Sequence, residues 1–110
     1  MDVWQLDSET VEAHAPRVLR SDEQANRVIL LALPEGELLQ DHQVHEHALV
    51  LLLEGELLIR SAEGERRLAP HGLLHFAPGE RHEVESVADS RLLILLAPWP
   101  GEGHPSRPDS

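Results

Sequence analysis

The sequence predicts an all-β protein, built as an antiparallel sandwich or barrel, and three observations support this fold class. The apolar segments are short, they are rich in Leu, Val and Ile, and they recur about every ten residues with turn-forming residues between them. Leu has a high helix propensity, but these segments are too short and too regularly interrupted to form helices. With 41% hydrophobic residues among 110, the chain can bury the core of one domain.

Ten apolar segments are the candidate strands, in chain order Val3–Leu6, Arg17–Arg20, Arg27–Leu33, Leu38–Leu39, His47–Leu53, Glu56–Arg60, Arg66–Leu68, Leu73–Phe76, His82–Val87 and Leu92–Ala97. Turn-forming residues separate them at Pro34–Gly36, Glu54–Gly55, Glu63–Gly64, Pro70–Gly72, Pro78–Gly79 and Asp89–Ser90. We interpret Gly55 as the centre of a tight hairpin. Only Asp7–Ala13 could form a helical turn.

Two of these strands are apolar on both faces, namely Ala48–Leu53 and Leu92–Leu96. A half-exposed antiparallel strand normally alternates apolar with polar residues. The second face of each strand therefore needs a cover, which could be the other sheet, the N-terminal arm or another subunit.

The charge and the residue types that are absent exclude several classes of function. The net charge of −11 disfavours binding to nucleic acid and to anionic membrane surfaces. All nine cationic residues are Arg, so Schiff-base chemistry and a P-loop Lys are excluded. The absence of Cys excludes disulfides, thiolate nucleophiles and iron–sulfur clusters. Eight His are the unusual chemical resource of the chain.

The organisation along the chain predicts one domain over residues 1–97 and a Pro/Gly-rich tail over residues 98–110. The tail lacks periodicity, and we expect it to be disordered or to lie along the surface. The start of the chain has no cationic segment typical of a signal peptide, and the longest apolar runs are too short to span a bilayer. We therefore expect a soluble cytoplasmic protein.

The segment from Gly36 to Gly55 carries an informative spacing. Five residues lie between Gly36 and His42, and one lies between His42 and Val44. Three residues then lie between Val44 and Ala48, and six lie between Ala48 and Gly55. This spacing resembles the first motif of the cupin superfamily, G-x5-H-x-H-x3-E-x6-G.

The second cupin motif falls in register on His71, Ala77, Gly79, His82 and Ser86. With both motifs inside residues 36–86, the chain resembles a small single-domain cupin, of the cupin type-2 conserved barrel or RmlC-like jelly-roll kind. The resemblance implies a single antiparallel jelly-roll β-barrel with a central pocket.

The resemblance also implies a metal site, with departures from the family pattern. His42 and His82 keep two of the four family ligand positions, whereas Val44 and Ala48 replace the other two. His45 and His47 lie one residue out of register with the lost ligands, and by strict alternation they face away from His42. A bulge at Asp41–His47 would bring His42, His47 and His82 together, with His45 either as a fourth ligand or as a residue that supports the ligands. Such a site would suit a divalent transition metal: Zn, Fe, Ni, Cu or Mn.

The alternative is a decayed metal site, in which His42 and His82 only line the pocket and His45 and His47 are solvated. We expect a structural role for His75, surface positions for His14 and His71, and an exposed carboxylate at Glu46. Three functions stay open. The chain is a metal-dependent enzyme with dioxygenase- or isomerase-like chemistry on a small oxygen-rich ligand, a metal-free binding or sensing protein for such a ligand, or a dimeric scaffold.

The doubly apolar strand also predicts a homodimer. In the family register Leu49, Leu51 and Leu53 face outward, where they would form an exposed apolar row that soluble monomers rarely tolerate. A second copy of the chain could cover this row; so could the chain's own N-terminal segment, which would leave a monomer. The expected partners are therefore another copy and a small-molecule ligand, with no nucleic acid and no membrane.

Overall fold

A computed structural model describes residues 1–39 and 45–105, in which seven strands and no helix occur. The strands are β1 (Arg17–Ser21), β2 (Ala25–Leu33), β3 (Leu38–Leu39), β4 (His47–Ser61), β5 (Gly64–Leu68), β6 (Leu73–Phe76) and β7 (His82–Trp99). All named pairings are antiparallel. The described residues thus contain no helix that could cross a membrane.

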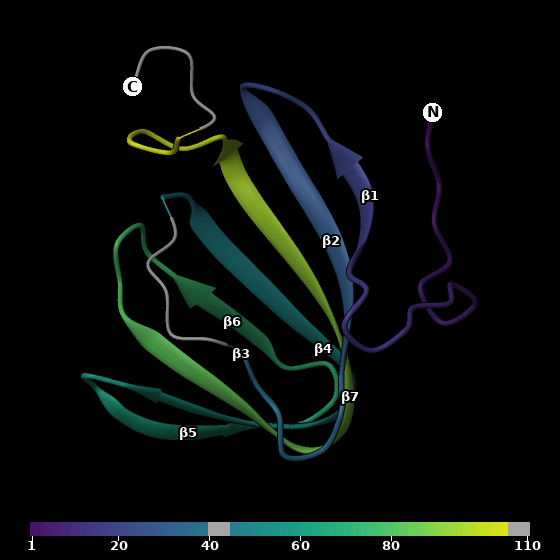
Figure 1. Cartoon of the computed structure of the whole chain (residues 1–110), viewed down its shortest axis with the longest axis vertical. Coiled ribbons are helices and arrows are strands. Elements are labelled where there is room, and N and C mark those ends of the chain that lie inside the picture. Colours follow the sequence, from purple (N-terminus) through teal and green to yellow (C-terminus); the bar gives the residue numbers. More distant parts are fainter. Residues whose placement is uncertain (40–44, 106–110) are drawn as a thin grey trace.

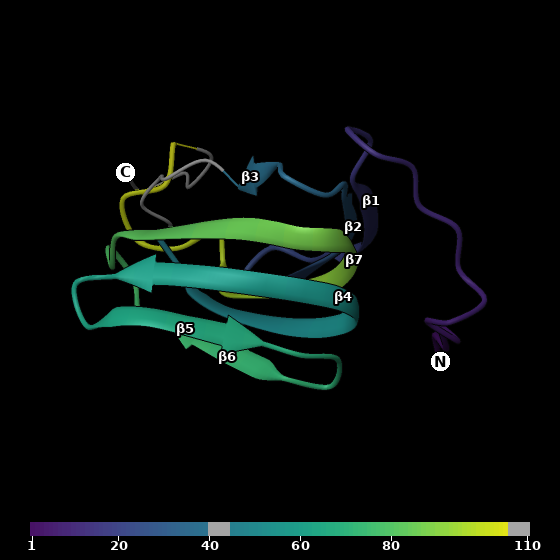
Figure 2. The ribbon, with the colours of Figure 1, turned by 90° about the horizontal axis from the view of Figure 1, so that it is seen from below.

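The two long strands β4 and β7 organise the sheet. The sheet order is β1-β2-β7-β4-β5, with β3 added to β7 and β6 added to β4. The first half of β4 pairs with β6 and with the second half of β7, whereas its second half pairs with β5 and with the first half of β7. Because both long strands bend, one sheet folds over on itself as a jelly roll (Figures 1 and 2). The all-β, antiparallel jelly-roll prediction is confirmed.

The predicted hairpin at Gly55 is wrong, because β4 runs through it without turning back. The register between β4 and β7 shifts three times between Leu52 and Leu57, and Gly55 takes a φ of +96°. This irregularity is a bulge, which bends a strand and changes which residues face inward. Before it Ala48, Val50 and Leu52 are buried; after it Leu57 and Ile59 are. Both halves of β4 therefore present apolar side chains to the core.

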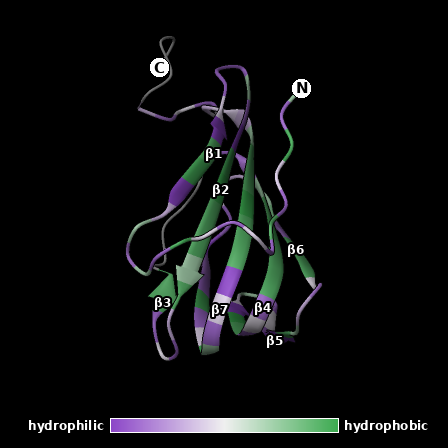
Figure 3. Ribbon diagram, turned by 90° about the vertical axis from the view of Figure 1, so that its right-hand side faces the viewer, coloured by the Kyte–Doolittle hydropathy of each residue, from purple (hydrophilic) through white to green (hydrophobic). Residues whose placement is uncertain are grey.

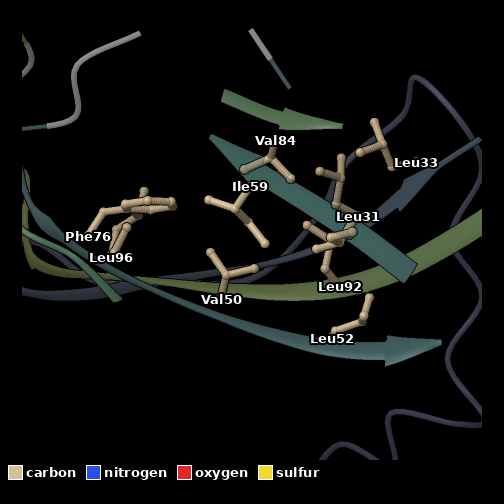
Figure 4. Packing of buried hydrophobic residues seen from close by; sticks show 11 residues of the cluster. Leu31, Leu33, Val50, Leu52, Ile59, Phe76, Val84, Leu92 and Leu96 are labelled. Atoms are coloured by element: carbon tan, nitrogen blue, oxygen red, sulfur yellow. The ribbon is translucent and has the colours of Figure 1, made fainter. Parts of the chain in front are cut away.

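The core lies between the two halves of the folded sheet. Figure 4 shows Val50 and Ile59 of β4, Phe76 of β6, and Val84 and Leu96 of β7 packed together. These side chains are between 1 and 9% exposed. Alternation along each strand is what directs them to one side.

The strands β2, β7 and β4 contain long apolar stretches, drawn in green in Figure 3, so apolar residues also occupy their outer face. Leu49, Leu51 and Leu53 point to this face and are half-buried. Part of the cover is the chain before β1, which crosses these strands in Figure 3. The Arg91 guanidinium holds this arm by donating to the backbone oxygens of Leu6 (2.8 Å) and Glu9 (2.6 Å). The N-terminal arm is thus fixed to the outer face at Arg91.

The segment after Ala97 packs against the end of the barrel as far as residue 105. Strand β7 continues to Trp99, which packs against the core, and Arg27 lies 4.7 Å above its ring. Gly101 is buried and comes so close to the His45 carbonyl that a Cβ would lie 2.1 Å from its oxygen. Part of the tail that we expected to be disordered or to lie along the surface therefore closes one end of the domain.

Candidate functional site

His82 is the predicted site residue that faces the interior among the described residues. It opens β7 opposite Ser61, and the same face continues two residues on with the buried pair Val84 and Ile59. Its ring stacks on Phe76, with centroids 3.6 Å apart and planes 10° apart. Its Nδ1 lies 3.2 Å from the backbone oxygen of Glu80, to which an Nδ1–H donates. Ring stacking and this hydrogen bond fix the orientation of the imidazole.

The turn before His82 is ordered by its own residues. Gly79 takes a φ of +77°, which a glycine adopts without strain. The Glu80 carboxylate accepts the backbone N–H of Ala77 at 3.1 Å. The turn at Pro78–Gly79 in the second motif thus positions His82 at the start of β7.

His47 lies on the opposite face of the sheet, so its expected grouping with His82 is not found. A bulge was needed to turn it inward, but the register from His47 to Leu52 is regular. Alternation then places His47 outside, because Ala48 is buried. Its Nδ1 lies 2.9 Å from Nε2 of His75, which is also exposed.

His45 is likewise exposed; its ring contacts that of His104 at a centroid distance of 5.5 Å.

Glu46 lies between the two outward histidines, and its burial differs from the sequence prediction. Glu46 is not an exposed carboxylate but is 2% exposed, and its Oε2 accepts the backbone N–H of Gly101 at 2.6 Å. A buried carboxylate needs such a partner. Glu46 therefore binds the C-terminal segment to the barrel.

The predicted metal ligands do not form a metal centre in the described part of the chain. His42 lies outside the described residues, as does Val44. Residues 1–39 and 45–105 hold no group of three or more His, Cys, Asp or Glu side chains that could bind one ion. Since a catalytic or structural centre for a divalent transition metal normally has at least three protein ligands, His82 with its described neighbours does not fit such a centre.

A pocket of about 250 Å³ opens between β5 and β6. Both strands pair with β4, one with each half, and they do not pair with each other. The pocket has an apolar part and a polar part, formed by Ile59, Leu74 and Phe76 and by Ser61, Glu63, Gly64, Arg66, His75 and Glu80. Phe76 joins it to His82, since the two rings are stacked.

Arg66 is the cationic side chain at this pocket. It pairs with Ile59 across β5 and β4 and so shares the inner face, whereas the next residue, Arg67, points outward and pairs with Glu56. Five other arginines make ion pairs: Arg17, Arg20, Arg60, Arg67 and Arg91. Among the described residues Arg66 makes none. Its guanidinium is therefore available to an anionic oxygen.

A second, more open pocket of about 230 Å³ lies on the other side of Ser61 and includes His82 and Arg60. It holds two arginines, Arg60 and Arg81, and carboxylates already neutralise Arg60. The hydrogen bonds that the Arg60 guanidinium donates to Glu85, Glu65 and Glu83 raise its pKa. An anionic ligand is thus better served by Arg66 than by Arg60.

Several solved structures superpose on this chain. An RmlC-like cupin from Desulfovibrio desulfuricans superposes with a TM-score of 0.76 at 18% identity, covering 89% of this chain and 97% of that one. A cupin superfamily protein from Desulfitobacterium hafniense gives 0.70 at 15% identity, covering 83% and 84%. A cupin 2 conserved barrel protein from Salinispora arenicola gives 0.68 at 16%, covering 86% and 87%.

The chain has the cupin fold. This confirms the resemblance drawn from the two motifs as far as the fold is concerned. No family model matches the sequence, and no curated protein matches it. At 15–18% sequence identity a shared fold does not indicate a shared ligand or reaction, because proteins with one fold can have many different functions.

Sequence reasoning missed Phe76 and Arg66 as site residues. The signal for Arg66 was present in the alternation of β5, where one of two consecutive arginines must face inward. For Phe76 the signal was weaker, since a single aromatic in a short strand is normally core. Its contact with His82 becomes evident only when β6 and β7 are placed.

Proposed function

We propose that this cupin binds a small oxygen-rich molecule carrying one carboxylate in the pocket between β5 and β6. The observation that carries the proposal is Arg66, an exposed cation on the same face as Ile59, without an ion pair among the described residues and bordering a pocket with an apolar floor. A guanidinium binds a carboxylate through two parallel N–H donors. Ser61 adds a hydroxyl that can donate to or accept from a second oxygen.

The size and charge of the pocket limit the ligand. At about 250 Å³ it is below the usual range for drug-sized ligands, so it suits a molecule of few atoms. Glu63 and Glu80 also border it and disfavour a second negative charge. Phe76, with Leu74 and Ile59, offers an apolar surface for the carbon skeleton. A small monocarboxylate satisfies all three conditions.

The proposed binding requires no metal, which separates it from the metal-dependent enzyme we also considered. His82 contributes by holding Phe76 in place through ring stacking. Its own orientation depends on the Glu80 backbone, so the floor of the pocket and the second motif form one unit. This favours the binding or sensing alternative over metal catalysis.

Thermal denaturation of Arg66→Gln and Arg67→Gln tests the proposal. The probes are lactate and pyruvate, with their neutral amides as controls, in the presence of a chelator. A ligand at a hundred times its Kd adds about 2.7 kcal/mol of stability, which raises the Tm of a domain near this size by about 10–20 °C. Wild type and Arg67→Gln should show a rise with the acids only, and Arg66→Gln should show none. A rise retained in Arg66→Gln, or one that requires added metal, would contradict the proposal.

A second copy of the chain is the other proposed partner, which would cover the outer face of β4 and β6. Leu51 pairs with Leu73, which is 64% exposed on that face. Fully burying a Leu side chain contributes about 1.5–3 kcal/mol, so a two-fold axis that doubles each contact favours association. The supporting observation is that the N-terminal arm leaves Leu73 uncovered.

A further inference from the structure

His47 and His75 form a close pair on the outer face of the sheet, away from the interior where His82 lies. Leu49 pairs with His75, and His47 precedes Leu49 by two residues, so the two histidines are diagonal neighbours on one face. Both side chains are exposed. Nothing in the fold of the core requires them, and the proposed carboxylate site does not use their contact.

The two rings present nitrogens to each other. Nδ1 of His47 and Nε2 of His75 are 2.9 Å apart, while the ring centroids are 5.1 Å apart and the planes differ by 18°. The nitrogens therefore face each other across the gap. One of them donates a hydrogen bond and the other accepts it, so at least one imidazole is neutral.

This separation matches the spacing of two adjacent ligands on a metal ion. With metal–nitrogen bonds of about 2.0–2.1 Å, two ligands at right angles lie about 2.9 Å apart, and two at a tetrahedral angle lie about 3.3 Å apart. Right-angle positions occur in the square-planar and tetragonal geometries of Cu²⁺ and Ni²⁺. The χ2 torsion of His is broad, so each exposed ring can turn its lone pair toward a shared ion.

We propose that His47 and His75 form a two-histidine surface site for a tetragonal divalent cation, Cu²⁺ or Ni²⁺. The ion replaces the proton between the two nitrogens. When both rings are neutral, the ring that loses this proton takes one up on its other nitrogen, so both ligands stay neutral imidazoles; when one ring is charged, one proton is released to solvent. Water molecules fill the other coordination positions. The net charge of −11 raises the local concentration of divalent cations around the chain. The site is distinct from the interior metal centre that the two motifs implied, because it uses His75 and lies on the opposite face from His82.

Isothermal titration of Cu²⁺ and Ni²⁺ into protein purified without a His-tag tests the site. Wild type should bind one ion per chain. Loss of even a supporting residue weakens metal binding about 10–100-fold, so loss of a ligand in His47→Gln or His75→Gln should weaken it at least tenfold. The matched control is His71→Gln, which removes an exposed histidine outside the pair and should bind as wild type.

Two further measurements keep the outcome decisive. The double variant should bind no more weakly than either single variant, because both remove the same site. His82→Gln should leave Cu²⁺ binding unchanged, since it lies on the inner face. The proposal is overturned if wild type binds neither ion, if His47→Gln and His75→Gln bind as wild type, or if His82→Gln abolishes binding. Carboxylate stabilisation measured in the same variants reports separately on the pocket, which His75 borders.

Discussion

Gly55→Ala should strongly destabilise the fold, because this residue lies in the bulge where the pairing of β4 with β7 shifts register. A Cβ at this position would lie 2.2 Å from Oγ of Ser90, 2.5 Å from the backbone oxygen of Asp89 and 2.7 Å from Cα of Ser90. Two of these three atoms belong to the backbone of β7, so no rotation of a side chain relieves the contact. The φ of +96° adds strain for any residue with a Cβ.

The expected magnitude has two parts. A left-handed backbone costs a non-glycine residue about 1–2 kcal/mol, and forcing additional atoms into a packed site costs about 1–3 kcal/mol. The sum, about 2–5 kcal/mol, is a large share of the roughly 5–15 kcal/mol that stabilises a domain. Since the bulge also changes which residues face inward, loss of its geometry would misdirect either Val50 and Leu52 or Leu57 and Ile59.

Urea denaturation followed by circular dichroism measures this loss, and Gly36→Ala provides the matched control. Gly36 has a similar φ of +83°, but nothing lies within 4 Å of its added Cβ. The control therefore carries the backbone strain without the clash. Gly55→Ala should be less stable than Gly36→Ala by about 1–3 kcal/mol. Equal stabilities of Gly55→Ala and Gly36→Ala would refute the close approach of Gly55 to the backbone of β7.

Two other predictions concern the outer face and the interior. Leu51→Asp should dissociate the proposed dimer in light scattering, because a buried unpaired carboxylate is strongly unfavourable; a wild-type mass of one chain would contradict the dimer, and Glu54→Asp on the same strand is the conservative control. Ser86→Ala should lower the free energy of unfolding by about 1–3 kcal/mol, because its fully buried hydroxyl binds the Pro34 oxygen and accepts the Glu37 N–H. As a control, Ser8→Ala at an exposed position should change the free energy of unfolding little. If Ser8→Ala and Ser86→Ala lower it equally, the buried hydrogen bonds of Ser86 do not stabilise the fold.

Several strands could be predicted to the residue because their ends have local causes. Leu73–Phe76 lies between the turns at Pro70–Gly72 and Pro78–Gly79, and Leu38–Leu39 follows the turn at Pro34–Gly36. The continuity of β4 could not be predicted in the same way. A Gly between two glutamates is compatible with a hairpin and with a bulge, and only the partner strand β7 decides between them.

Glu46 could have been placed from the sequence by the alternation rule alone. It has the same parity as Ala48, Val50 and Leu52, the residues that were expected to face inward. Its charge argued for exposure, since an unpaired buried carboxylate is rare. The partner that makes burial tolerable is the N–H of Gly101, which lies in a segment whose sequence has no strand periodicity. A long-range contact of this kind leaves no local signal.

The same rule explains why histidines that match a motif in number need not form its site. A displacement of one residue along a strand moves a side chain to the other face of the sheet. His47 is one residue from Ala48, which occupies a family ligand position and is buried. The register between β4 and β7 is regular from His47 to Leu52, so no bulge turns His47 to the inner face. His47 therefore contacts His75 rather than His82. In a small barrel the parity of a residue, more than its chemical type, therefore decides which of two surfaces its chemistry serves.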